Sequence, residues 1–358
     1  MPRARELGLP LLGETGPHNA VTDVPGVEVG FTTLIRGDGA LKVGVGPVRT
    51  GVTAVLPRGK TDDPVFAGVA VLNGNGEMTG AAWVEESGFL EGPVLLTNTH
   101  SVGTVRDAAI RWSVLRGYAP QPWQLPVVAE TYDGFLNDVN GFHVEEAHVF
   151  SALDRAASGP VLEGNVGGGT GMGLFGFKGG TGTASRRLPD GLTVGVLVQA
   201  NFGSRDDLLV CGVPVGREIT DLLPTYGNCA APSEGGSIIA VVATDAPLLP
   251  HQLKRLARRV PLGVARTGGV GENDSGDLFI AFSTANAGVY GVSGAHTVTA
   301  LPNDALSSLF RATVQASEEA VLNALVAAQT MTGQGGNTRF ALPHDRLSEV
   351  MRRYNRLA

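Results

Sequence analysis

The stretch SEGGSIIAVVAT (233–244) joins a loop to a buried strand. Residues 213–236 are rich in proline and glycine and show little periodicity, which is typical of a loop. The run 237–244 is almost entirely apolar after its first residue, as expected of a strand that is covered on both faces. The sequence therefore predicts that a core strand begins at the hydroxyl side chain of Ser237, directly after Gly236.

A serine at this junction has the chemistry to cut the chain before it. Its hydroxyl can attack the carbonyl of Gly236, and hydrolysis of the resulting ester then frees Ser237 as a new N-terminus. Glycine suits position 236, since it tolerates unusual φ and ψ angles and leaves the carbonyl uncrowded. The freed α-amine, with a pKa of about 8, can act as an internal base for the hydroxyl. Taken alone, Gly-Gly-Ser before a strand is more often a plain turn.

Both halves of the chain contain predicted strands and predicted helices, which favours sheets covered by helices in layers. Residues 1–19 look like a loose arm, and Leu-Pro-Asp-Gly (188–191) predicts a hairpin turn. The predicted strands are 26–34, 43–57, 65–73, 94–97, 126–132, 180–187, 192–202, 206–212, 237–244 and 277–284, and the predicted helices are 98–116, 143–157, 250–260, 304–330 and the segment from 343 onward.

Composition and charge limit the class of protein. The chain has 358 residues, of which 43% are hydrophobic, enough for a large core. The formal net charge is −7 and only 254–259 is basic, so no nucleic-acid partner is expected. Neither a signal-peptide pattern nor an apolar stretch of roughly 18 residues occurs, which predicts a cytoplasmic protein with no membrane partner. Two cysteines without a Cys-x-x-Cys spacing, and no His-Glu-x-x-His motif, predict no metal and no cofactor.

Several long blocks carry a more specific signal than any short motif. They are NAVTDVPGVEVG (19–30), NGNGEMTGAAWVEESGFLEGPVLLTNTHSVGTVRDA (73–108), VVAETYDGFLND (127–138), GNVGGGTGM (164–172), VQANFG (198–203), EGGSIIAVVATDAPL (234–248), ARTGGVGENDSGDLFIAFSTAN (265–286) and NALVAAQTMTG (323–333). In this order the blocks resemble the self-processing aminopeptidases of the L-aminopeptidase/D-esterase type (DmpA-like), which include the β-peptidyl aminopeptidases. The resemblance covers nearly all of 19–343.

The resemblance implies a fold and a form of processing. The fold is a four-layer αββα sandwich of the α+β class, shared with ornithine acetyltransferases, and residues 1–358 would form one such domain. Processing would cut the chain into an α chain, 1–236, and a β chain, 237–358, which stay associated. Members of the family are typically assemblies of four such pairs. The substrates would be small peptides, amino-acid amides or esters.

The resemblance also assigns catalytic roles residue by residue. The nucleophile matches Ser237, and a second serine and a carboxylate that assist it match Ser275 and Asp277. A member of the family has Glu at the carboxylate position, so Asp277 is shorter by one methylene. Residues i and i+2 of a strand share a face, which would place the Ser275 and Asp277 side chains in one pocket.

Three further residues match positions around the substrate. Asn201 matches the asparagine that helps to hold the oxyanion, and Tyr132 matches a residue beside it. Glu130 matches the acid that binds the free ammonium of the substrate, and a charge-assisted bond of this kind rejects blocked N-termini. Without the resemblance, Ser275, Asp277 and Asn201 would each be read as turn, cap or hairpin residues.

Two rival functions remain at this stage. An acyltransferase on the same fold is one, although the Lys-Gly-Ser-Gly-Met type of setting around the threonine nucleophile of ornithine acetyltransferases is absent. Nucleotide binding is the other, because GGGTGMG (167–173) is similar to a phosphate loop whose backbone amides cradle an anion. That mode needs a helix directly afterwards, and the glycines that follow make a helix improbable.

Overall fold

The apolar run after Gly236 forms strand β11 (Ser237–Thr244), and its side chains alternate between two cores. Ile238, Ala240 and Val242 face one core, whereas Ile239, Val241 and Ala243 face another. The run is therefore apolar throughout because both faces of this strand are covered. The computed structural model describes residues 2–227 and 236–357, so the predicted loop 213–236 lies partly outside the described residues.

Strand β11 lies inside the larger of two stacked sheets, and its neighbours are β10 and β12. It runs parallel to β12 and antiparallel to β10, and the register places Ser237 between Asn201 and Gly276. In spatial order the six strands of this sheet, as far as the chain is described, are β4 (Phe89–Leu90), β3 (Val65–Gly74), β12 (Gly276–Ser283), β11, β10 (Thr193–Asn201) and β9 (Gly180–Arg187).

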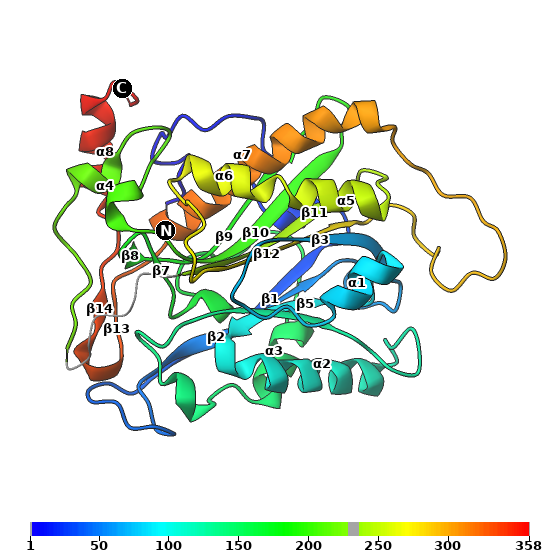
Figure 1. Ribbon diagram of the computed structural model, residues 1–358, viewed down its shortest axis with the longest axis horizontal. Helices are drawn as coiled ribbons and strands as arrows, with labels where there is room; N and C mark the ends of the chain where they lie inside the picture. Colours follow the sequence, from blue (N-terminus) through cyan, green and yellow to red (C-terminus); the bar gives the residue numbers. More distant parts are fainter. Residues whose placement is uncertain (1, 228–235, 358) are drawn as a thin grey trace.

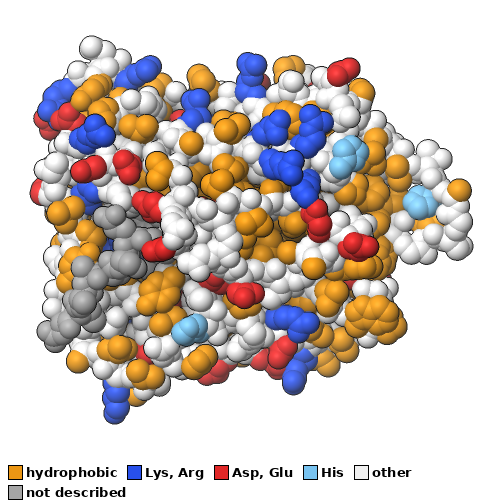
Figure 2. All heavy atoms as spheres, in the orientation of Figure 1, with side chains coloured by type: hydrophobic (Ala, Val, Ile, Leu, Met, Phe, Trp, Pro, Cys, Tyr) orange, Lys and Arg blue, Asp and Glu red, His pale blue; other side chains and the backbone are white. Residues whose placement is uncertain are grey.

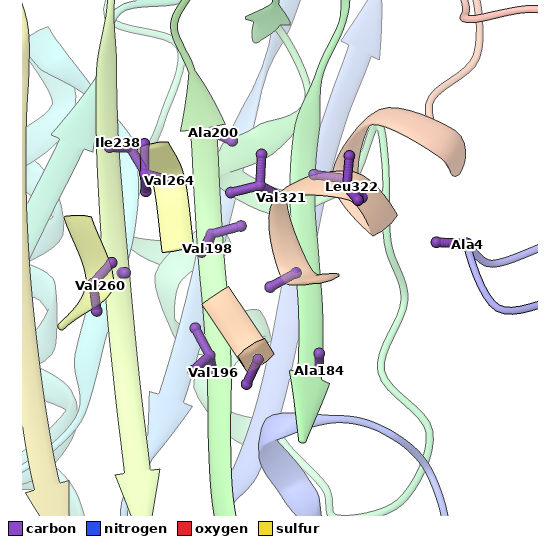
Figure 3. Close-up of a cluster of buried hydrophobic side chains, with 14 of the residues drawn as sticks. Ala4, Ala184, Val196, Val198, Ala200, Ile238, Val260, Val264, Val321 and Leu322 are labelled. Carbon is purple, nitrogen blue, oxygen red and sulfur yellow. The ribbon is translucent and has the colours of Figure 1, made fainter. Parts of the chain in front are cut away.

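Three helices cover the outer face of this sheet: α5 (Pro250–Ala257), α6 (Val260–Arg266) and α7 (Leu306–Val326). Figure 3 shows Val264 of α6 and Val321 of α7 packed over Val198 and Ile238 of the sheet. Helix α7 lies directly on β9, where a Cβ at Gly182 would come within 2.0 Å of the Ala320 carbonyl oxygen. Glycine is therefore required at this crossing.

The smaller sheet stacks on the inner face of the larger one, and two helices cover its far side (Figure 1). The result is the αββα order of layers that the family resemblance implied. The strands, in spatial order, are β1 (Glu28–Arg36), β2 (Val48–Leu56), β5 (Val94–Asn98) and β6 (Val127–Thr131), and the helices are α2 (Val102–Arg116) and α3 (Glu146–Asp154).

Two predictions about the chain's local structure are wrong. The segment 206–212 is not a strand, because it begins in a 3-10 helix and then turns back at Cys211 and Gly212, which have positive φ angles, so that Val210 pairs with Val213. Residues 1–19 are not a loose arm, since Ala4 and Leu9 are buried in the outer core. Short elements complete the structure: α1 (Ala81–Ser87), α4 (Val215–Glu218), α8 (His344–Arg353), β7 (Gly173–Leu174), β8 (Phe177–Lys178), β13 (Met331–Thr332) and β14 (Thr338–Arg339).

The basic segment 254–259 lies at the end of α5 and in the turn that follows it. Figure 2 shows basic side chains gathered over these helices. Two of them, Arg255 and Arg259, stack on the ring of Phe310, at 5.1 and 3.8 Å from its centroid. The two guanidinium groups therefore contribute to the packing of the helices on this face. Among the described helices, none is long and apolar enough to cross a bilayer.

A buried ion network fastens α7 to β9 and to the N-terminal segment. The Glu319 carboxylate is fully buried and accepts hydrogen bonds from Arg186 at 2.6 Å, from Arg5 at 2.9 Å and from Asn19 at 2.5 Å. Burial alone would raise the pKa of Glu319, but the two guanidiniums outweigh it and lower the pKa. The carboxylate is thus charged and compensated.

We expect Glu319→Gln to lower the free energy of unfolding by about 3–5 kcal/mol, because the Arg186 guanidinium would stay buried without its counter-charge. Urea denaturation followed by tryptophan fluorescence measures the change. The matched control is Glu85→Gln, which removes an exposed pair with Lys254 and should change stability by less than about 1 kcal/mol. Equal effects of the two substitutions would contradict a structural role for the buried network.

Candidate active site

The Gly236–Ser237 peptide bond lies where β11 enters the sheet. The N–H of Gly276, on the neighbouring strand β12, donates to the carbonyl oxygen of Gly236 at 3.2 Å. The same N–H lies 3.3 Å from Oγ of Ser237 and donates to it as well. A single backbone donor therefore contacts both the carbonyl that would be attacked and the hydroxyl that would attack it.

Glycine is required at position 236 for lack of space. A Cβ there would come within 2.4 Å of the Asn201 carbonyl oxygen and 2.5 Å of the Phe202 Cα. What the absence of a side chain provides is close contact with the end of β10, which keeps the peptide bond in place.

Ser275 and Asp277 share one pocket at the start of β12. The Ser275 hydroxyl donates to Oδ1 of Asp277 at 2.6 Å, so the shorter aspartate reaches its serine. Oδ2 of Asp277 accepts a hydrogen bond from the Asn73 side chain at 3.0 Å. Burial raises the pKa of Asp277, and the hydrogen bonds from Ser275 and Asn73 oppose that rise. All three groups are thus positioned by each other before any ligand binds.

Asn201 ends β10 directly opposite Ser237. Its side-chain oxygen accepts from the Gly173 N–H at 2.8 Å, and its amide nitrogen donates to the Tyr132 carbonyl oxygen at 3.0 Å. Because a backbone N–H can only donate and a carbonyl oxygen can only accept, these two hydrogen bonds distinguish the oxygen of the Asn201 side-chain amide from its nitrogen. One N–H of Asn201 has no partner among the described residues and can serve a developing oxyanion.

Glu130 is buried at the end of β6. Oε1 accepts from the Glu77 N–H at 3.1 Å, and Oε2 accepts from the Thr99 hydroxyl. Burial raises the pKa of Glu130, and these two hydrogen bonds oppose the rise. No described cation forms an ion pair with the carboxylate, which is the setting expected of a group that receives a charged ligand.

Four of the predicted catalytic and substrate-binding residues line one cavity of about 730 Å³, a volume that suits a small ligand. Ser237, Glu130, Tyr132 and Asn201 all line it, whereas Ser275 and Asp277 line an adjoining apolar pocket of about 240 Å³. Tyr132 is half exposed and its ring packs over Gly134, so its backbone carbonyl, rather than its hydroxyl, contacts Asn201.

Sequence reasoning missed the supporting groups of the site. These are the side chains of Asn73 and Thr99, the backbone N–H groups of Glu77 and Gly276, and Arg339 on the cavity wall. The blocks 73–108 and 265–286 contain four of them, but a block does not show which of its residues face the site. Arg339 lies outside every block, and no sequence signal pointed to it.

The structure argues against the phosphate-loop reading of 167–173. The N–H groups of Gly167 and Gly168 already donate to the hydroxyls of Thr33 and Thr53, and Gly173 donates to Asn201. The loop leads into β7 rather than into a helix. Its amides support the smaller sheet and the site instead of cradling an anion. Over residues 2–227 and 236–357, no cluster of three His, Cys, Asp or Glu side chains is arranged to hold a metal ion.

Known proteins with similar sequences and the same fold agree with this geometry. The profile of "Peptidase family S58" matches residues 19–339. Two β-peptidyl aminopeptidases named BapA are similar over nearly the whole chain. That of Sphingosinicella microcystinivorans is 56% identical and covers 100% of this chain and 93% of its own, and that of Sphingosinicella xenopeptidilytica is 50% identical and covers 98% and 91%.

Solved structures extend the comparison to the fold. The L-aminopeptidase D-Ala-esterase/amidase of Ochrobactrum anthropi, described as a prototype of the serine aminopeptidases and a variant of the Ntn hydrolase fold, superposes with a TM-score of 0.93. It is 50% identical, and both chains are covered completely. A β-aminopeptidase from Burkholderia sp. gives a TM-score of 0.89 at 48% identity, covering 98% of this chain and 99% of its own. With its profile match, its αββα layers and its relatives, the chain belongs to peptidase family S58 and is a hydrolase of the aminopeptidase type.

Proposed function

We propose that this protein cuts itself between Gly236 and Ser237 and then uses Ser237 to release N-terminal residues from peptides, amino-acid amides or esters. The observation that supports this most directly is the shared donor at the junction. The Gly276 N–H contacts the Gly236 carbonyl oxygen and Oγ of Ser237 together. The relatives named as β-peptidyl aminopeptidases and as an aminopeptidase with esterase and amidase activity point to the same chemistry.

Self-cleavage would begin with attack of Ser237 Oγ on the Gly236 carbonyl carbon. The oxygen of that carbonyl becomes negative, and the Gly276 N–H already donates to it. The C–N bond then breaks, the nitrogen of Ser237 takes up a proton, and an ester links the two residues. Hydrolysis of the ester by water gives a carboxylate on Gly236 and a free amine and hydroxyl on Ser237.

In the mature enzyme the α-amine of Ser237 would accept the proton of its own hydroxyl as that hydroxyl attacks a substrate carbonyl. The second N–H of Asn201 and the N–H of Gly276 are the donors available to the oxyanion. Ser275, polarised by Asp277, would relay a proton beside the nucleophile. An acyl-enzyme on Ser237 results, and water releases the N-terminal residue.

Glu130 would select substrates with a free amine. Its carboxylate lies on the wall of the cavity that contains Ser237 and makes one hydrogen bond through each oxygen, which leaves lone pairs for an ammonium. A charge-assisted bond of this kind favours a free N-terminus over a blocked one.

We propose the same organisation for this chain as the resemblance implies. Residues 1–358 form one αββα unit, cleavage gives an α chain of 1–236 and a β chain of 237–358, and four such pairs assemble. The interleaving of strands from both segments in the larger sheet supports an association that persists after the cut.

Ser237→Ala should leave one full-length, inactive chain, because the attacking oxygen is removed. Intact-mass spectrometry of purified protein measures this, and the unsubstituted protein should give two fragments that meet between Gly236 and Ser237. Ser308→Ala, an exposed serine on α7, is the control and should still give two fragments. Two fragments from Ser237→Ala would remove Ser237 from the reaction.

Gly236→Ala should slow self-cleavage by roughly a hundredfold, because the new Cβ has no room beside Asn201 and Phe202 and must displace the carbonyl from its donor. A time course of band appearance on a denaturing gel after expression gives the rate. Gly103→Ala is the matched control, since a Cβ there meets nothing within 4 Å. Cleavage of Gly236→Ala at the normal rate would show that the close contact is not needed.

Glu130→Gln should reduce kcat/KM for peptides with a free amine by roughly 30-fold or more, corresponding to about 2 kcal/mol. Esters whose amine is acylated should be affected far less, because they place no charge beside residue 130. Steady-state kinetics on both substrate classes separates the two. Equal losses would exclude Glu130 from amine recognition.

The raised pKa of Glu130 also predicts the direction in which Glu130→Gln changes the stability of the folded protein. Burial raises the pKa of Glu130 in the folded protein, so the stability that its neutral form contributes is present below the unfolded pKa and is lost as the pH rises through the folded value. Glu130→Gln should therefore unfold at a higher urea concentration than the unsubstituted protein at pH 7. The difference should close as the pH falls below about 4. A variant less stable at pH 7 would contradict this assignment of the pKa shift.

A further inference from the structure

The cavity around Ser237 has two flanks, defined by the strands on either side of β11. On one side Ser237 pairs with Gly276 of β12, and on the other with Asn201 of β10. A substrate whose carbonyl group lies at Ser237 therefore has its amine end and its leaving group between these two flanks.

Glu130 belongs to the β12 flank. The position that a Cβ would take on Gly76 lies 3.3 Å from Oε1 of Glu130 and also 3.3 Å from the Cα of Gly276. Only a backbone segment thus separates the carboxylate from the strand beside Ser237. The ammonium of a substrate bound to Glu130 would lie on this side.

Arg339 belongs to the β10 flank. Its guanidinium packs on Gly173, where a Cβ would come within 2.3 Å of its Cζ. Gly173 is the residue whose N–H donates to the side chain of Asn201, opposite Ser237. Arg339 therefore lies one residue away from the oxyanion asparagine, and it lines the same cavity as Glu130.

The positive charge of Arg339 lacks a counter-charge in the described chain. Across residues 2–227 and 236–357, no carboxylate forms an ion pair with it, and its buried Nε has no hydrogen-bond partner. Burial lowers the pKa of Arg339 to about 10, so the group stays charged at neutral pH. The guanidinium of Arg339 stacks on Phe135, at 4.6 Å from the ring centroid. This stacking holds the guanidinium in place without using its N–H groups.

Arg205, the other arginine of the cavity wall, shows what a structural guanidinium looks like in this protein. Its nitrogens donate to the carbonyl oxygens of Phe175, Ile219, Asp221 and Leu222, and its face lies 3.3 Å from the centroid of Phe177. Arg205 is thus fully engaged in holding a loop. Arg339 lines the same cavity, but its guanidinium donates to no acceptor in the described part of the chain.

We propose that Arg339 binds the C-terminal carboxylate of a short peptide, so that Glu130 and Arg339 recognise the two charged ends of one dipeptide substrate across Ser237. The proposal rests on the aminopeptidase function proposed above and names its substrate class. A planar guanidinium matches a carboxylate through two parallel N–H···O bonds, and burial strengthens them. Peptides of two residues would then be preferred to longer peptides and to amides.

The test compares two matched pairs of peptides: β-alanyl-L-leucine with its C-terminal amide, and L-alanyl-L-leucine with its C-terminal amide. In each pair the same bond is cut, and only the terminal charge differs. For the unsubstituted protein we expect kcat/KM to be at least about tenfold higher for the free acid, mainly through KM. Arg339→Met should lower the ratio of kcat/KM for the acid to kcat/KM for the amide to about 1.

Controls keep the result interpretable. Arg346 on α8 forms an exposed ion pair with Asp221, and Arg346→Met should change kcat/KM for neither peptide. Arg339→Lys keeps the positive charge but lacks the planar guanidinium, and it should retain part of the preference for the acid. The comparison of acid with amide in the unsubstituted protein needs no variant, so it decides the question even where Arg339→Met fails to fold.

Each contrary outcome has a separate meaning. Equal hydrolysis of acid and amide by the unsubstituted protein would overturn the carboxylate site while leaving the aminopeptidase in place. Equal losses on both peptides in Arg339→Met would assign Arg339 to support of the fold and would also overturn the site. Failure of the unsubstituted protein to cut any of the four peptides would overturn the aminopeptidase proposal, and the carboxylate site with it.

Discussion

The close packing of Gly236 against the end of β10 is the constraint on which the site depends. The peptide bond before Ser237 cannot move away from the sheet, because β10 lies against the Gly236 Cα on one side and the Gly276 N–H holds its carbonyl on the other. Every other group of the site takes its place relative to this bond. Asn201 faces it from β10, and the Ser275–Asp277 pair begins the strand that carries Gly276.

How much of this the sequence could predict depends on the range of the interaction. The loop-to-strand change at Ser237 is local, and so it predicted both β11 and the candidate cleavage bond. The αββα order and the roles of Glu130, Asn201, Ser275 and Asp277 came from the family resemblance. The hydrogen bond from the Gly276 N–H to Oγ of Ser237 joins distant segments, and a backbone donor leaves no mark in the residue type.

The site also lowers the stability of the fold in places. Glu130 and Asp277 are buried carboxylates whose pKa values are raised by desolvation, which means that their charged forms are disfavoured where they stand. Hydrogen bonds from Thr99, Glu77 and Asn73 compensate only in part. Glu319, on the far side of the larger sheet, has the opposite balance, since two guanidiniums fully offset its burial. The carboxylates of the candidate site thus differ in their electrostatic balance from a carboxylate that holds the structure.

The position of β11 and β12 in the middle of the larger sheet has a consequence for how the protein is made. A cut after Gly236 would place these two strands and helix α7 on one polypeptide, and β3, β9 and β10 on another. The two cores on the faces of the larger sheet would then each contain residues of both polypeptides, so neither polypeptide could form them alone. Reassembly from the denatured state would become a second-order encounter that depends on concentration, whereas the uncut precursor folds in a first-order reaction. If the chain is cleaved as proposed, the uncut precursor would be the form that folds at high dilution, and the two cleaved chains would keep the architecture that the precursor reached.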